Sequence, residues 1–190
     1  MAVSHSYTPL DIPCPDCGGC AQFEDAFEFA VAGSGEQRPG WHFWGGWIVR
    51  EKFPSLVRWK APRGSDQVLL RGTQPGRAQS HTGYLLLSKG VRRCACGGIG
   101  VHELTWPSDA FWRWSIRGQT LWAYNRDHAQ ALLGYIGADG PARPKAPSRL
   151  PTHFLRAKVR EEVVTQITRS LEKHPPRVPW GSEKPEAPPP

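Results

Sequence analysis

Two short cysteine motifs constrain the fold of this chain more than any other feature of its sequence. The first is Cys14-Pro15-Asp16-Cys17 followed by two glycines, and the second is Cys94-Ala95-Cys96 followed by two more. Two thiolates this closely spaced can reach one metal ion at about 2.3 Å, and a glycine after each second cysteine allows the positive φ of a tight turn. Cys14, Cys17, Cys94 and Cys96 therefore predict a tetrahedral structural zinc site.

The separation between the two motifs is unusual for such a site. Seventy-six residues lie between Cys17 and Cys94, whereas about 15 to 20 residues usually separate the two pairs. A large insertion is compatible with one site because the cost of loop closure rises only with the logarithm of length. Cys20 could replace Cys17 or one of the later pair, and His102 is a weaker substitute. For Cys20 we favour a small buried hydrophobic residue.

The same motifs argue against catalysis. Four thiolates fill the coordination sphere of zinc and leave no position for water. The zinc-deaminase pattern also needs an upstream His-x-Glu, but His5 is followed by Ser6 and Tyr7. A redox Cys-x-x-Cys motif places its first thiol at a helix N-terminus, whereas glycines follow here. A zinc or thiol enzyme is therefore the least favoured hypothesis, and no catalytic residue is predicted.

Positive charge is concentrated in the middle of the chain. The whole protein has a net charge of +7, yet residues 38–93 carry eleven Lys and Arg against two acids, which makes that segment +9. Such a segment can attract nucleic acid by neutralising phosphates. The candidate phosphate contacts are Arg50, Lys52, Arg58, Lys60, Arg92 and Arg93. Arg92 and Arg93 have an alternative role, since a zinc ion with four thiolates carries a charge of −2 that neighbouring cations offset.

Nine tryptophans are a large number for 190 residues. Trp41, Trp44 and Trp47 lie in one string that contains two glycines, and four more lie between residues 106 and 122. An aromatic surface beside basic residues can stack nucleic-acid bases. The alternative is that wide rings fill the core of a small β domain, and we expect this of most of them.

Hydrophobic periodicity predicts an α+β fold. Residues 1–137 are expected to form a small antiparallel, β-rich, zinc-ribbon-like domain with a β insertion at about 38–93. One strand is predicted after the first cysteine motif, through Phe23, Phe27 and Phe29. Others are predicted at 47–49, 56–59, 68–70, 84–87, 91–93 and 98–106, with residues 88–90 as a turn and a hairpin over 111–124. A short helix at about 126–136 ends this domain.

The C-terminal part has a different composition. Residues 138–151 contain four prolines and predict a stiff linker. A longer helix is expected within 152–174, starting near His153, because apolar residues recur there at helical spacing. Residues 175–190 contain seven prolines and the single aromatic residue Trp180, so this tail is expected to be disordered.

The chain lacks signals for export or membrane insertion. No apolar stretch approaches the roughly 20 residues of a membrane-spanning helix, and Met1–Leu10 lacks the basic and apolar pattern of a signal peptide. Clustered cysteines without an export signal favour metal ligation in a reducing compartment. A cytoplasmic protein without a membrane partner is expected.

The strings Cys-Pro-Asp-Cys-Gly-Gly at 14–19 and Cys-Ala-Cys-Gly-Gly at 94–98 resemble the zinc-ribbon knuckles of many transcription, translation and DNA-processing proteins. This resemblance implies a metal site and no particular task. The second half, including Arg117–His128 and Leu150–Phe154, is similar to bacterial proteins of unassigned function, which implies a bacterial, cytosolic origin. The expected function is binding, with nucleic acid ahead of a protein partner that contacts the C-terminal helix and the Pro-rich tail.

Overall fold

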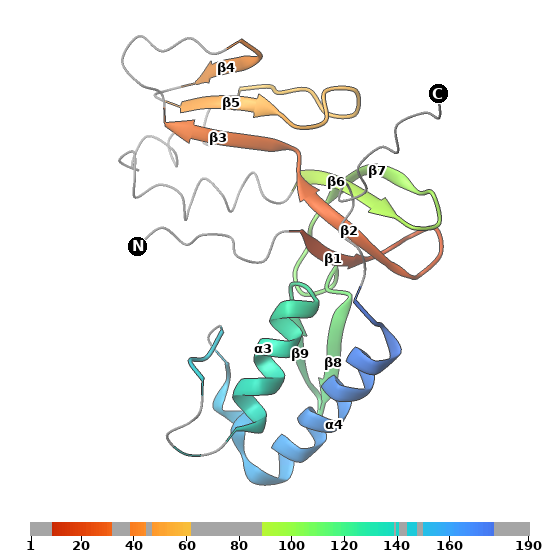
Figure 1. The fold of residues 1–190 in the computed structure, drawn as a ribbon, viewed down its shortest axis with the longest axis vertical. Helices are drawn as coiled ribbons and strands as arrows, with labels where there is room; N and C mark the ends of the chain where they lie inside the picture. The colour runs from red at the N-terminus through yellow and green to blue at the C-terminus, as the bar shows by residue number, and fades with distance from the viewer. Residues whose placement is uncertain are drawn as a thin grey trace, which may run out of the picture. The chain divides into compact units, whose positions relative to one another are not determined.

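The computed structural model describes residues 9–31, 39–44, 47–61, 89–138, 140, 144–147 and 150–176. The chain divides into two compact units, one comprising Met1–Arg113 and Trp122–Asn125 and the other Trp114–Leu121 and Arg126–Pro190. The described residues contain antiparallel strands and helices (Figure 1), which confirms the predicted α+β class. Within the described ranges, none of the helices has the length and apolar character needed to span a bilayer.

A four-stranded antiparallel sheet, which we call sheet A, contains both cysteine motifs. Its strands are β1 (Leu10–Pro13), β2 (Cys20–Asp25), β6 (Lys89–Cys94) and β7 (Ile99–Glu103), in that spatial order. The strands β1 and β2 form one hairpin and β6 and β7 another, and Ala21 pairs with Cys94 where the two hairpins meet. Each hairpin turns at one cysteine motif, so the pairing of β2 with β6 brings the two motifs to the same end of the sheet.

Alternating apolar residues bury one face of sheet A. The cluster on this face consists of Leu10, Ile12, Cys14, Ala21, Phe23, Cys94 and Leu104, with Trp106 and Tyr124 packed against it. The period-two pattern of β1 and β2 places their apolar side chains on this face. Two of the four metal-ligand candidates thus belong to the hydrophobic core of the sheet.

The segment between β2 and β6 forms a second sheet, sheet B. Its strands are β3 (Phe27–Val31), β5 (Trp47–Glu51) and β4 (Trp41–Trp44), in that spatial order. A separate core holds it, made by Ala26, Phe27, Val49, Val57 and Val91 with Trp44, Phe53 and Trp59 packed against them. A β insertion between the cysteine pairs is therefore present, and it includes β3, which precedes residue 38.

Two local predictions for this region are wrong. Residues 56–59 do not form a strand: the N–H groups of Leu56 and Val57 donate to the Phe53 carbonyl in a turn (3.0 and 2.9 Å). The apolar side chain of Val57 packs into the core of sheet B, which accounts for the hydrophobic pattern without a strand. Lys89 and Gly90 are the first residues of β6 and not part of a turn. The runs predicted at 68–70 and 84–87 lie outside the described residues.

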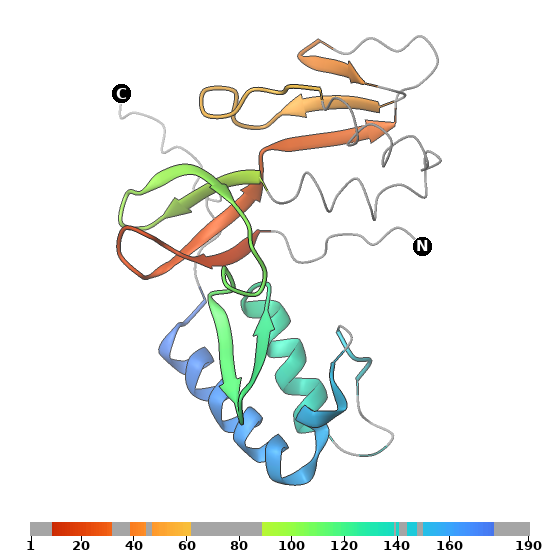
Figure 2. The ribbon, with the colours of Figure 1, turned by 180° about the vertical axis from the view of Figure 1, so that it is seen from behind.

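The second unit combines a hairpin tip with two helices (Figure 2). The strands β8 (Trp112–Ile116) and β9 (Gln119–Ala123) confirm the predicted hairpin. Arg117 and Gly118 connect them with φ of 49° and 79°, the positive values that a two-residue type I′ turn requires. Helix α3 (Arg126–Gly137) confirms the predicted short helix.

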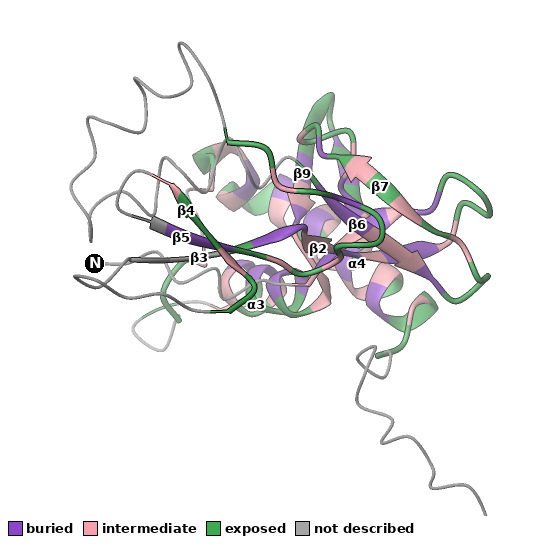
Figure 3. Ribbon diagram, turned by 90° about the horizontal axis from the view of Figure 1, so that it is seen from above, coloured by how far each residue is buried: buried purple, intermediate pink, exposed green. Residues whose placement is uncertain are grey.

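The C-terminal helix starts later than predicted. Thr152–Leu155 form a 3-10 helix, η2, and α4 spans Ala157–Lys173, because Arg156 between them has extended backbone angles. The apolar stripe of α4 is buried, and Figure 3 shows buried positions alternating with exposed ones along it. Trp114 Nε1 donates to Ser170 Oγ (2.8 Å), and Arg126 donates to the carbonyls of Leu171 and His174 at the end of α4. Most of the predicted tail, including Trp180, lies outside the described residues.

Candidate metal centre

The two cysteine motifs adopt the same backbone arrangement. In the first, Cys14 N–H donates to the Gly19 carbonyl (2.7 Å) and Gly18 N–H to the Cys14 carbonyl (2.8 Å). In the second, Cys94 N–H donates to Gly98 (2.9 Å) and Gly97 N–H to Cys94 (3.0 Å). Gly18 and Gly97 have φ of 67° and 90°. The prediction of positive φ after each second cysteine is therefore confirmed, and its reason is the tight turn that aims two sulfurs the same way.

The four predicted cysteines converge. Their sulfur atoms all lie within 4.8 Å of one another, with Cys14 and Cys96 sulfurs 3.8 Å apart and Cys17 and Cys94 sulfurs 3.6 Å apart. Four sulfurs around a tetrahedral zinc ion at about 2.3 Å would be separated by about 3.8 Å. All five cysteines are free thiols, and these separations are far longer than the roughly 2.05 Å of a disulfide. The cluster can therefore hold a metal ion.

Burial differs among the four thiols and perturbs their acidity. Cys14 and Cys94 are buried, whereas Cys17 and Cys96 are exposed. Burial raises the pKa of the Cys94 thiol to about 12. Burial also acts to raise the pKa of Cys14, but hydrogen bonds from the backbone N–H groups of Cys17 and Asp16 outweigh it and lower the value to about 7. A bound cation would supply the positive charge that a buried thiolate at Cys94 needs.

An ion pair lies beside the sulfur cluster. The Arg92 guanidinium donates to both carboxylate oxygens of Asp16 (2.8 and 3.4 Å) and lies 3.8 Å from the Cys14 sulfur. The hydrogen bond to Asp16 raises the pKa of Arg92 further, so its positive charge is permanent. A Cβ at Gly98 would lie 3.2 Å from the guanidinium and still closer to the Asp16 carboxylate. Gly98 thus leaves room for the pair, a role of Asp16 and Gly98 that the sequence did not reveal.

The alternative ligands lie outside the cluster. Cys20 is buried, with its sulfur 3.9 Å from the carbonyl oxygen of the next residue, Ala21. The His102 ring lies beside Phe23, with Nε2 3.1 Å from an Asp109 carboxylate oxygen. Of the residues that the structure describes, only Cys14, Cys17, Cys94 and Cys96 form a group suited to a metal ion.

Most of the basic residues proposed to contact phosphate are paired with acids. Arg50 pairs with Glu28, Lys52 with Glu24 (2.9 Å), Arg58 with Glu51 (3.1 Å) and Arg92 with Asp16. The Arg93 guanidinium lies 4.7 Å from the centre of the Phe53 ring, and Lys60 is exposed. The acids come from neighbouring strands and turns, so the charge count of residues 38–93 overstates the free positive charge.

No protein-family model, curated protein or solved structure matches this chain. The sulfur cluster and the surfaces of the two sheets are therefore the features that bear on function.

Proposed function

We propose that Cys14, Cys17, Cys94 and Cys96 hold a structural zinc ion. The observation that carries this proposal is the set of sulfur separations of 3.6 to 3.8 Å, which match a tetrahedral site of four thiolates. Such a ligand set suits zinc or iron, and zinc is the metal of most structural four-cysteine sites. With four protein ligands the ion has no open position, so its role is to stabilise the fold.

The zinc would join parts of the chain that are far apart in sequence. It connects the β1–β2 hairpin to the β6–β7 hairpin, and these hairpins also hold the two ends of the insertion that contains sheet B. The energy of metal binding is folding energy when the site does not exist in the unfolded chain. Arg92 offsets part of the negative charge of the metal–thiolate group.

Metal analysis and a pair of cysteine variants test the zinc site. We expect one zinc ion per chain and, by X-ray absorption, four sulfur ligands at about 2.3 Å. Cys14→Ser should lose the metal and much of the stability of sheet A, whereas Cys20→Ser, which also changes a buried thiol, should keep the metal. Chelator should lower the melting temperature of the wild-type protein. Oxygen or nitrogen ligands, or melting that chelator leaves unchanged, would count against the site.

We further propose that this zinc-stabilised module binds nucleic acid through a basic, Trp-rich β surface. The positive charge of residues 38–93, which acids from neighbouring strands offset only in part, supports this, and both side chains of the Arg50–Glu28 pair are exposed to solvent. An exposed ion pair contributes only about 0 to 1 kcal/mol, so a phosphate can replace Glu28 at little cost. Fluorescence anisotropy with DNA and RNA decides the matter: affinity should fall steeply as salt is added, and an absence of binding at low salt would refute the proposal.

A protein partner is the second candidate, and the structure limits how it would bind. The apolar residues of α4, Val159, Val163, Ile167 and Leu171, are already buried. A partner of this region would therefore contact the polar face of α4 or the Pro-rich tail. Deletion of residues 177–190, beyond α4, should abolish recovery in a pull-down of a partner that binds the tail, and unchanged recovery would exclude the tail as its binding element.

A further inference from the structure

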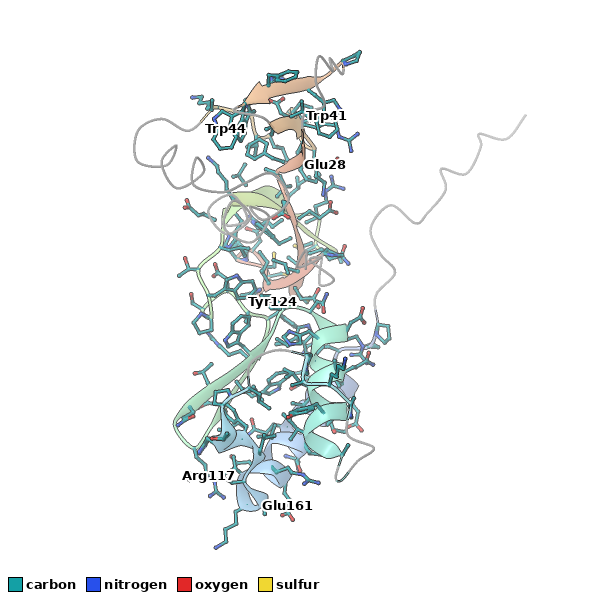
Figure 4. All side chains as sticks on the ribbon, turned by 90° about the vertical axis from the view of Figure 1, so that its left-hand side faces the viewer. Glu28, Trp41, Trp44, Arg117, Tyr124 and Glu161 are labelled. Atoms are coloured by element: carbon teal, nitrogen blue, oxygen red, sulfur yellow. The ribbon has the colours of Figure 1, made fainter. Side chains whose placement is uncertain are left out.

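One row of side chains crosses all three strands of sheet B. Arg50 of β5 is the register partner of Glu28 on β3 and of Trp41 on β4. The guanidinium pairs with the Glu28 carboxylate and lies 5.4 Å from the centre of the Trp41 ring. Figure 4 shows Glu28 and Trp41 on the same side of the sheet and Trp44 on the other. The row thus presents a carboxylate, a cation and an aromatic ring side by side.

Phe43 extends the row along the outer strand. It lies two residues after Trp41 on β4, so its side chain is on the same face, about 6.8 Å further along the strand. With 57 % of its surface exposed, it is the most exposed large hydrophobic side chain among the described residues. Trp44 instead packs against the core of sheet B. Core packing therefore explains Trp44 but leaves the exposure of Phe43 without a structural reason.

We propose that the face formed by Trp41, Phe43 and Arg50 binds single-stranded nucleic acid. This inference rests on the nucleic-acid-binding function proposed above and assigns its site and the strand state of its ligand. Two aromatic rings at alternate positions of one strand can each stack a base of an extended single strand. A duplex keeps its bases stacked on each other and cannot offer their faces, so the rings favour a single strand.

The cation of this face is Arg50, which favours a ligand that carries phosphate. The neighbouring basic residues add little to it, because Lys52 pairs with Glu24 and Arg58 pairs with Glu51, whose side chain lies on the opposite face of β5. The Arg50–Glu28 pair is half exposed on both sides, at 53 % and 45 % of the side chains. An incoming phosphate can therefore displace Glu28 from Arg50 while the guanidinium stays stacked near Trp41.

Substitutions at Phe43 and Glu28 should change the affinity for nucleic acid in opposite directions. Phe43→Ser should weaken binding of the full-length, zinc-loaded protein to a labelled oligo-dT at least about fivefold, the loss expected for one stacked base. Glu28→Gln should strengthen binding, because it frees Arg50 for phosphate, while the melting temperature of the protein stays unchanged. Val101→Ser is the matched control: Val101 is also exposed, at 44 %, but lies on β7 of sheet A, so its change should leave affinity unaltered.

The results of these measurements distinguish the proposed site from the broader proposal that the protein binds nucleic acid. Wild-type protein that binds none of single-stranded DNA, single-stranded RNA or duplex would overturn both proposals. If Phe43→Ser and Glu28→Gln change affinity no more than the control Val101→Ser, the proposed site is wrong, although the protein still binds nucleic acid. Tighter binding to a duplex of the same length would overturn the assignment of a single strand. Tighter binding to polyglutamate than to oligo-dT of equal charge would show that the face takes an acidic protein instead.

Discussion

Gly90 stands at the point where the two hairpins of sheet A first pair, opposite Asp25 of β2 and His102 of β7. A Cβ added there would lie 2.7 Å from Cε2 of Phe23, and closer still to Cζ of that ring and to the Glu24 carbonyl oxygen. Phe23 is fully buried, so its ring has no free space to move into. Gly90→Ala should therefore push β2 and β6 apart.

The expected cost follows from these contacts. Carbon atoms normally approach to about 3.5 to 4.0 Å, so the new methyl group is more than 1 Å too close to Cζ, the nearest atom of the ring. Overpacking a closed core costs about 1 to 3 kcal/mol, and the backbone carbonyl in the contact places this site at the upper end. Alanine also reduces the conformational entropy of the unfolded chain, which offsets up to about 1 kcal/mol of this cost. A net loss of about 2 kcal/mol should lower the melting temperature by roughly 4 to 8 °C.

Urea unfolding and thermal melting of the zinc-loaded protein measure this loss. Gly134→Ala is the matched control, because a Cβ at this exposed position of α3 meets nothing within 4 Å. It should stabilise the helix by about 0.5 to 1 kcal/mol. The same substitution thus has opposite signs at the two sites. If Gly90→Ala proved as stable as the wild-type protein, the pairing of β2 with β6 in this register would be refuted.

Three further changes test the surroundings of the metal, one carboxylate and the second unit. Arg92→Gln removes the cation that pairs with Asp16 and should weaken metal affinity about 10- to 100-fold; competition with a chromogenic chelator measures it, and unchanged affinity would contradict charge compensation. Burial raises the pKa of Asp25 from about 4 to about 6. The folded state therefore holds the proton more tightly, and the free energy of unfolding should fall by about 2 kcal/mol as pH rises through this window. The free energy of unfolding of Asp25→Asn, measured with urea between about pH 4 and 7, should not show that fall. If it depends on pH as the wild-type value does, Asp25 is not the titrating group. Trp114→Phe removes the hydrogen bond to Ser170 (2.8 Å) and should cost about 1 kcal/mol in thermal melting, whereas an unchanged melting temperature would show that the bond is dispensable.

The two cysteine motifs were predictable because their geometry is local. The spacing of Cys14 and Cys17, and of Cys94 and Cys96, limits each pair to one turn, and the positive φ of Gly18 and Gly97 follows from that turn. The hairpin over β8 and β9 was predictable for the same reason, since the sequence around Arg117 and Gly118 specifies a tight connection. The 56–59 segment was not, because its apolar residues serve a distant core and not a strand.

The sequence by itself therefore determined two sulfur-bearing turns, the α+β class and an excess of positive charge between the turns. Only the tertiary structure decided that Cys20 lies outside the cluster, because the register of β2 against β6 selects which sulfurs meet. It also decided which basic residues are paired, since Glu24 and Glu28 reach Lys52 and Arg50 only after the strands fold together. Local motifs depend on neighbours along the chain, whereas charge pairing, exposure of Phe43 and ligand selection depend on contacts between residues that are far apart in sequence.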